Sequence, residues 1–379
     1  MRYFAFCIMV WLVMPSFGQT AAELERKLST IEGTEKVKTL NLLFGAWIDQ
    51  DPVRASGYAR EALALANEVG DTHGMAAAYN NLGVVYRNHG ALDKALEFYI
   101  TAEGLFRKTN DKPGLAATHN NIGTVYSLKK DAEKAKGYFE DATKLFRELN
   151  DTIRLIGALN NLGNVTSEVT KHQEGLKFFE EAVILGERSG LSSPDPLINI
   201  GTMFLRKREH EKAVEYLNRA AGLATGMQKG ESLLSIKIGL GNAWLSSGNL
   251  KASEKALLEA LDLSEQLQAY VYEPEIYKTL AVNFASQNRM REAYDNMLKF
   301  EQSRERIFSE ESGKKIAQME MLIDIHEKEK EIERLKKDEA IQAIELQRTR
   351  LAITLIVISI LTAVLLVNYI LQKRKASKK

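Results

Sequence analysis

A short pattern of apolar and polar positions recurs seven times along the chain, and its clearest copy is Tyr79-Asn80-Asn81-Leu82-Gly83-Val84-Val85-Tyr86. The steps between copies are 40, 40, 40, 38, 40 and 40 residues when the central positions are aligned at Leu43, Gly83, Gly123, Gly163, Gly201, Gly241 and Ala281. A pair of helices of this length cannot bury its apolar face alone, so successive copies stack into a solenoid. The pattern therefore predicts an all-α fold with a long concave surface that binds other chains.

Each copy divides into a first and a second predicted helix. Numbered from one to 34, the copies begin at Lys36, Ala76, Ala116, Ile156, Pro194, Leu234 and Pro274. In the second copy, Tyr79, Gly83 and Tyr86 mark the first helix, and Ala95 and Tyr99 mark the second. This motif resembles the tetratricopeptide repeat, and the resemblance covers roughly residues 36–300. It implies a right-handed solenoid whose first helices line a groove for a peptide or protein.

The small residue in the middle of each first helix predicts close helix packing, because a larger side chain would push the second helix away. Turn residues mark the helix ends. Gly90 and Gly248 are expected to end first helices in the left-handed conformation, Asp131 and Asn249 to cap second helices, and Pro113 and Pro274 to start helices.

At the 38-residue step, Ser193-Pro194-Asp195-Pro196 predicts a tighter or differently angled loop. The shorter step indicates either a local change of superhelical twist or a neutral deletion.

A repeat of about 40 residues resembles the extended variety found in kinesin light chains and peptide-responsive regulators. That resemblance implies that positions two, five, six, nine and twelve of each copy face the ligand. The candidate groove residues at these positions are Asn80, Asn81, Arg87, Asn120, Asn121, Asn160, Asn161, Asn164, Asn199 and Asn242. An asparagine column offers donors and acceptors to the backbone of an extended peptide. The alternative is that asparagine at position six belongs to the repeat itself and ties neighbouring helices together.

The first repeat departs from this column, because Leu40, Phe44 and Trp47 make its corresponding face apolar. This face either grips a hydrophobic side chain of the ligand or packs against the N-terminal cap segment, residues 19–35.

Composition restricts the function further. The net charge of +1 provides no field that would recruit nucleic acid. The single cysteine, Cys7, excludes a disulfide framework, a cysteine-based zinc site and a catalytic thiolate once the N-terminal segment is removed. No histidine pair has metal-ligand spacing, and His119 occupies an aromatic packing position. We therefore expect no enzyme activity and no cofactor.

Both ends of the chain carry apolar runs. Residues 1–18 have the composition of a secretory signal peptide with cleavage after Gly18, or alternatively of an uncleaved anchor. Residues 351–371 contain no charge and are long enough for one transmembrane helix. The basic tail of residues 372–379 predicts a cytoplasmic C-terminus, which places the repeats in the periplasm of a bacterium, anchored to the inner membrane.

Between the repeats and the apolar run, residues 301–350 predict a charged helical stalk. Apolar positions such as Ile316, Ile323 and Leu335 favour a dimeric coiled coil, with a solitary rigid spacer as the alternative. This segment resembles the juxtamembrane region of bacterial tetratricopeptide-repeat sensor histidine kinases and regulators. The eight residues after Leu371 leave no room for the kinase or helix-turn-helix output of those proteins. His326-Glu327 resembles a phosphoacceptor pair but lies on the periplasmic side of the predicted membrane helix.

The sequence therefore predicts a membrane-anchored periplasmic protein that binds a peptide or protein as the input module of a signal-transduction system. A cytoplasmic or membrane signalling partner is expected to receive the signal. The alternative is a static envelope scaffold that uses the same groove without any signalling role.

Overall fold

The computed structural model describes residues 17–169 and 173–308, together with residues 334, 337, 341–342, 344–355, 358–359 and 361. The chain divides into two compact units, Met1–Ser312 and Gly313–Lys379. The first unit contains the repeats. Its described residues form helices and turns and contain no β-strand.

The helices of this unit follow one another at nearly constant length. They are α1 (Phe17–Leu28), α2 (Gly33–Trp47), α3 (Pro52–Val69), α4 (Thr72–Asn88), α5 (Leu92–Lys108), α6 (Lys112–Leu128), α7 (Ala132–Glu148), α8 (Thr152–Val169), α9 (Gln173–Ser189), α10 (Pro194–Arg206), α11 (His210–Gly226), α12 (Gly230–Ser246), α13 (Leu250–Gln266), the 3-10 turn η1 (Tyr270–Tyr272) and α14 (Glu273–Ser286). Residues 290–308 are also helical. From α2 onward the described part therefore holds seven helical hairpins, as the sequence period predicts.

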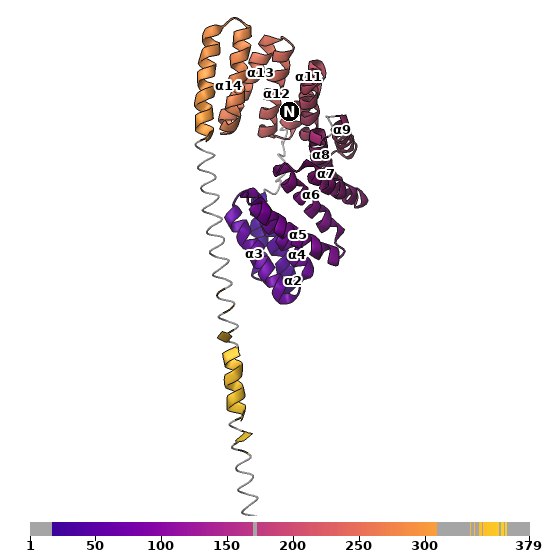
Figure 1. Cartoon of the computed structure of the whole chain (residues 1–379), viewed down its shortest axis with the longest axis vertical. Coiled ribbons are helices and arrows are strands. Elements are labelled where there is room, and N and C mark those ends of the chain that lie inside the picture. Colours follow the sequence, from indigo (N-terminus) through magenta and orange to yellow (C-terminus); the bar gives the residue numbers. More distant parts are fainter. Residues whose placement is uncertain are drawn as a thin grey trace, which may run out of the picture. The chain divides into compact units, whose positions relative to one another are not determined.

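The hairpins stack in chain order (Figure 1). Each first helix contacts the first helix of the next hairpin, from α2 and α4 through to α12 and α14. In the described part, the backbones of successive second helices do not approach each other as closely. Long side chains join them instead, as in the ion pairs of Arg147 in α7 with Glu181 in α9 at 2.6 Å and of Arg219 in α11 with Glu187 in α9 at 2.9 Å. Because the first helices are packed more closely than the second helices, the stack bends toward them, and they form its inner wall.

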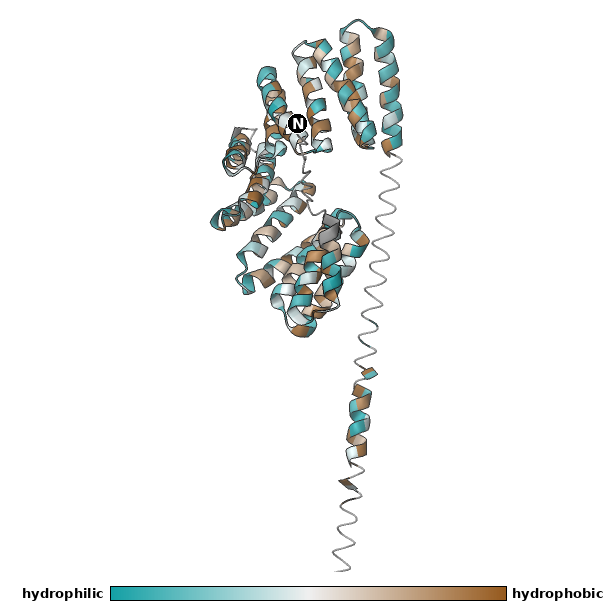
Figure 2. Cartoon of the chain, turned by 180° about the vertical axis from the view of Figure 1, so that it is seen from behind, coloured by the Kyte–Doolittle hydropathy of each residue, from teal (hydrophilic) through white to brown (hydrophobic). Residues whose placement is uncertain are grey.

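The hydrophobic positions of the helices alternate with polar ones along each helix (Figure 2). The buried apolar side chains form a series of clusters between neighbouring hairpins rather than one central core. One such cluster holds Ala76, Ala102 and Phe106 of the second hairpin, and Leu115 of the third hairpin packs against it. Each hairpin therefore gains its stability from its neighbours, as expected for a solenoid.

The glycine column allows the close packing that the sequence predicts. A Cβ atom added at Gly83 would lie 2.5 Å from the Tyr99 ring, and one added at Gly163 would lie 2.5 Å from the Phe179 ring. In the fifth and sixth repeats, Leu217 and Leu257 occupy the same place beside Gly201 and Gly241. Tyr99 and Phe179 are almost completely buried, and burial raises the pKa of the Tyr99 hydroxyl.

The predicted turn residues are confirmed. Gly90 and Gly248 have φ of 76° and 81°. The side chains of Asp131 and Asn249 accept hydrogen bonds from backbone N–H groups at the starts of α7 and α13. Pro113 and Pro274 stand in the first turns of α6 and α14. Other turns place non-glycine residues at positive φ, namely Asn110, Lys130, Asn150, Arg208, Gln228, Gln268 and Asn288.

Of the two alternatives at the 38-residue step, the tighter loop is wrong. The connection between α9 and α10, residues 190–193, has four residues, against three in the connections of residues 109–111 and 149–151. It is α10 that is shorter, with 13 residues against 17 in α6 and α12. Ser193 caps α10, and Pro194 is its first residue. Since proline has no N–H and favours the first turn of a helix, the helix starts here and lacks its usual first turn.

The apolar face of the first repeat packs against the N-terminal helix α1. Leu40 and Phe44 are buried, and Leu28 of α1 packs against the cluster that contains Leu40. The Trp47 indole Nε1 donates to Glu25 Oε1 at 2.8 Å. Of the two interpretations of this face, the structure supports packing rather than a ligand contact.

Candidate functional site

Most of the predicted groove residues lie on the inner wall, where they connect successive first helices. The Nδ2 atom of Asn121 in α6 donates to Asn80 Oδ1 in α4 at 3.1 Å. The same bond joins Asn161 to Asn120 at 3.1 Å and Asn199 to Asn160 at 2.8 Å. Position six of the third, fourth and fifth repeats thus binds position five of the preceding repeat. These hydrogen bonds tie neighbouring helices together, which is the structural role considered for position six.

Asn41 extends this row into the first repeat, although it is missing from the candidate groove residues. Asn81 Nδ2 donates to Asn41 Oδ1 at 2.9 Å, because position five of the first repeat is Leu40 and offers no acceptor. The sequence held the signal for this residue, since Asn41 occupies position six of its repeat. We call the five residues Asn41, Asn81, Asn121, Asn161 and Asn199, with their partners at position five, the asparagine ladder.

The remaining candidates differ from the ladder. Arg87 Nη1 donates to Asn121 Oδ1 at 3.4 Å and therefore supports the ladder from its side. Asn242 donates to Glu275 Oε1 at 3.1 Å and accepts from Thr279 Oγ1 at 3.2 Å, which links the sixth and seventh repeats instead. Asn164 is exposed and has no hydrogen bond through its side chain to any described residue.

Position five keeps a group available for a ligand. The Oδ1 atoms of Asn80, Asn120 and Asn160 accept from the next repeat, but their Nδ2 groups have no acceptor among the described residues. These residues are half-buried on the inner wall. An N–H group in such a place gains a hydrogen bond when a ligand supplies a carbonyl oxygen. The ladder therefore fixes the orientation of three successive amide groups, each with an unused NH2 group.

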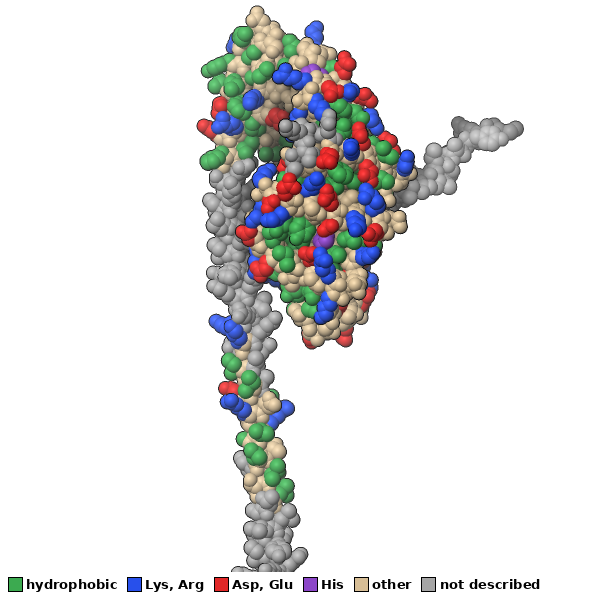
Figure 3. Space-filling view, turned by 45° about the vertical axis from the view of Figure 1, so that its right-hand side comes forward, with side chains coloured by type: hydrophobic (Ala, Val, Ile, Leu, Met, Phe, Trp, Pro, Cys, Tyr) green, Lys and Arg blue, Asp and Glu red, His purple; other side chains and the backbone are tan. Residues whose placement is uncertain are grey.

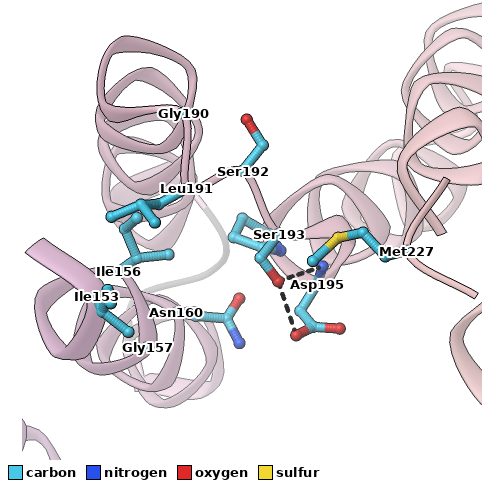
Figure 4. A pocket seen from close by; sticks show the side chains of 11 residues that line it. Ile153, Ile156, Gly157, Asn160, Gly190, Leu191, Ser192, Ser193, Asp195 and Met227 are labelled. Carbon is cyan, nitrogen blue, oxygen red and sulfur yellow. Dashed lines mark hydrogen bonds between the residues drawn. The ribbon is translucent and has the colours of Figure 1, made fainter. Parts of the chain in front are cut away.

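Two cavities lie next to the ladder. One has a volume of about 450 Å³ and includes Asn41 and Asn81 in its wall, beside Lys38, Leu42 and Ala77. The other has a volume of about 370 Å³ and includes Asn160 (Figure 4). The inner wall thus combines polar groups with hollows at both ends of the ladder.

Lysine, arginine, aspartate and glutamate side chains are interspersed over the face of the molecule seen in Figure 3. A face without a field of one sign does not steer a strongly charged partner.

The structure shows what surrounds His119 in its aromatic position. The imidazole is buried, lies edge-on to Tyr138 at 5.6 Å, and has Nε2 3.2 Å from Glu103 Oε1. Within the described ranges, no group of three or more His, Cys, Asp or Glu side chains is placed to hold a metal ion.

Several predictions concern the segments on either side of the repeats. No helix in the described part of the chain is both long enough and apolar enough to cross a membrane. The signal segment up to Ser16, His326, most of the stalk and most of residues 351–371 lie outside the described residues. The signal peptide, the coiled coil, the membrane helix and the periplasmic location stay predictions.

The fold and the inner wall define a class of protein, namely an all-helical repeat solenoid whose first helices present side chains for binding another chain. Residues 74–148 match the family model described as tetratricopeptide repeat. This part of the chain therefore consists of tetratricopeptide repeats, and the described helices from α2 onward continue the same hairpin. No curated protein matches the chain in sequence.

Solved structures with a similar fold include a Rap protein complexed with competence and sporulation factor. It has a TM-score of 0.56 and 16% identity, over 78% of this chain and 82% of that one. The apo form of the quorum sensor NprR from B. thuringiensis has a TM-score of 0.51 and 13% identity, over 76% and 92% of the two chains. A signal transduction ATPase with a tetratricopeptide repeat sensor from Pyrococcus horikoshii has a TM-score of 0.58 and 15% identity, over 78% and 49%. At these identities the similarity shows the fold alone.

Proposed function

We propose that the chain is a membrane-anchored periplasmic module whose groove binds an extended segment of a peptide or protein, and that this binding is the input of a signal-transduction system. The observation that carries the proposal is the row of unused amide donors on Asn80, Asn120 and Asn160, which the ladder holds in place. An extended chain presents backbone carbonyl oxygens along its length whatever its side chains are. Three aligned donors therefore suit a main chain better than a compact small molecule.

Two further observations support the proposal. The complex of a Rap protein with competence and sporulation factor has a similar fold to this chain, so this fold accommodates such a ligand. The apolar run of residues 351–371 and the basic tail after it, read from the sequence, support an anchor with the repeats outside the cytoplasm.

The groove is tested with the full chain and a pool of N-acetylated random hexapeptides. In Asn120→Asp, the carboxylate still accepts the hydrogen bond from Asn161 but donates none to a ligand. We expect the affinity for the pool to fall roughly tenfold, because a ligand carbonyl loses its donor and faces a negative charge. Isothermal titration calorimetry measures the change.

The matched control is Asn218→Asp, which adds the same charge on an exposed position of the outer helix α11. It should bind the pool as the unmodified chain does. Equal affinities for both variants would exclude position five from the groove. Binding that depends on Asn120 but leaves every transcriptional response unchanged would favour the scaffold function over signalling.

The predicted topology has its own test, in which alkaline phosphatase is fused to the chain in a bacterial host. This reporter is active only outside the cytoplasm. We expect an active enzyme when it follows Arg350 and an inactive one when it follows Lys379, because the residues between them would cross the membrane with the basic tail inside. Whole-cell phosphatase activity, normalised to fusion protein by immunoblot, provides the readout. Equal activities at both sites would contradict the anchor.

A further inference from the structure

The cavity beside Asn160 exists because α10 lacks its first turn. It lies between α8, residues 190–193, the start of α10 and the turn after α11. In the third repeat, whose first helix has full length, Leu115 of that turn packs against the cluster that contains Ala76 of the preceding first helix. Here, Ile153 and Ile156 of α8 face an opening of about 370 Å³ instead.

The wall of this cavity is largely apolar. Ile153, Leu191 and Met227 come from three different parts of the chain, and they are 67%, 41% and 49% exposed. Pro196 and Ile156 complete the apolar side. Three large apolar side chains around one opening leave apolar surface in water, and an apolar occupant would remove it from water.

The polar side chains of the cavity are few. Its one charged lining residue is Asp195, whose Oδ2 accepts from the Ser193 hydroxyl at 3.0 Å (Figure 4). Asn160 lies between these residues and the apolar side chains of α8 in the same view. Its Oδ1 accepts from Asn199, and its Nδ2 has no acceptor among the described residues. The cavity thus places the Asn160 amide next to an apolar hollow, with the Ser192 hydroxyl and the carboxylate of Asp195 at its polar edge.

We propose that this cavity is the subsite that selects the ligand, and that it takes one branched aliphatic or aromatic side chain of the segment bound in the groove. The Asn160 amide then donates to a backbone carbonyl oxygen next to that side chain. This inference rests on the proposed function of the groove. The size agrees, because a cavity of about 370 Å³ has room for one large apolar side chain together with the backbone next to it.

The test uses two pools of N-acetylated hexapeptides that are random except at the third residue, which is leucine in one pool and aspartate in the other. The full chain carries ¹³C-methyl methionine, so the Met227 methyl group reports from inside the cavity. Met290, which is 60% exposed in the last hairpin, is the internal reference. We expect the leucine pool to shift the Met227 signal at concentrations at least tenfold lower than the aspartate pool, without shifting Met290.

A blocking variant gives the matched comparison. A Cβ atom at Gly157 would meet no atom within 4 Å, so Gly157→Leu places its side chain in the cavity without disturbing α8. Gly137→Leu makes the same change in α7, where a Cβ atom also meets nothing within 4 Å. Gly157→Leu should weaken binding of the leucine pool at least tenfold, and Gly137→Leu should leave it unchanged.

The outcomes separate this inference from the proposed function. If Gly157→Leu binds the leucine pool as tightly as the unmodified chain, or if both pools shift Met227 equally, the subsite is overturned. In that case the groove stands as long as Asn120→Asp still weakens binding of the random pool. If neither pool binds and the random pool does not bind either, the proposed function fails together with the subsite.

Discussion

Replacing Phe179 with alanine is expected to lower the free energy of unfolding of the central repeats by about 3–5 kcal/mol, because it removes a fully buried ring and leaves a cavity. Phe179 is 1% exposed and belongs to a cluster that also holds Leu197 and Ile200 of α10. The ring fills the angle between α8 and α9 and also supports the junction with the fifth repeat. Its loss should therefore destabilise both repeats.

The measurement must resolve single repeats, since a long array does not unfold in one step. Native-state hydrogen exchange of the backbone amides in α8 and α9 gives the local free energy. The control is Ile184→Ala, also in α9, because Ile184 is 46% exposed. We expect this substitution to change the hydrogen-exchange free energy much less than Phe179→Ala does. A loss below about 1 kcal/mol for Phe179→Ala would contradict the packing of this ring between the repeats.

The second large effect is expected at two glycines of α8, Gly157 and Gly163, where substitution by alanine should change the free energy of unfolding in opposite directions. At Gly163 the added Cβ would lie 2.5 Å from the buried Phe179 ring, so overpacking should cost about 1–3 kcal/mol. At Gly157 the added Cβ meets nothing within 4 Å, so the better helix propensity of alanine should stabilise α8 by about 0.5–1 kcal/mol. Hydrogen exchange in α8 measures both changes under the same conditions.

A double substitution provides the control for this pair. In the Phe179→Ala background the ring is gone, so Gly163→Ala should no longer destabilise the chain, and the two effects should not add. If Gly163→Ala lowers the free energy of unfolding equally with and without the Phe179 ring, contact with this ring does not explain the glycine.

Much of the fold follows from the sequence because a repeat uses the same local interactions several times. The 40-residue period predicts the seven hairpins, and Gly90, Gly248, Asp131 and Asn249 predict helix ends that the structure confirms. The glycine column also predicts close packing, and its contacts with Tyr99 and Phe179 agree with that prediction. These features depend on spacing and backbone conformation, both of which can be read along a single chain.

The candidate site is predicted less completely. The sequence places asparagines at positions five and six, yet it does not show that Asn121 reaches back to Asn80 in the preceding repeat. In this pairing the side chain at position five uses its Oδ1 and leaves its Nδ2 unused. Which of the two atoms is used depends on how neighbouring first helices are placed relative to each other. Asn41 is not among the predicted residues because its repeat has leucine, not asparagine, at position five.

By itself, then, the sequence determined that this protein is a solenoid of tetratricopeptide repeats with an asparagine-rich inner wall, because helix periodicity and turn chemistry are local. The tertiary structure decided which amide donors the inner wall leaves unused and that the 38-residue step shortens α10, to 13 residues against 17 in α6 and α12, rather than the loop before it. It also decided that a cavity opens beside Asn160. The physical reason is that hydrogen-bond partners and cavities arise where separate repeats meet, and their relative placement is fixed by packing rather than by spacing along the chain.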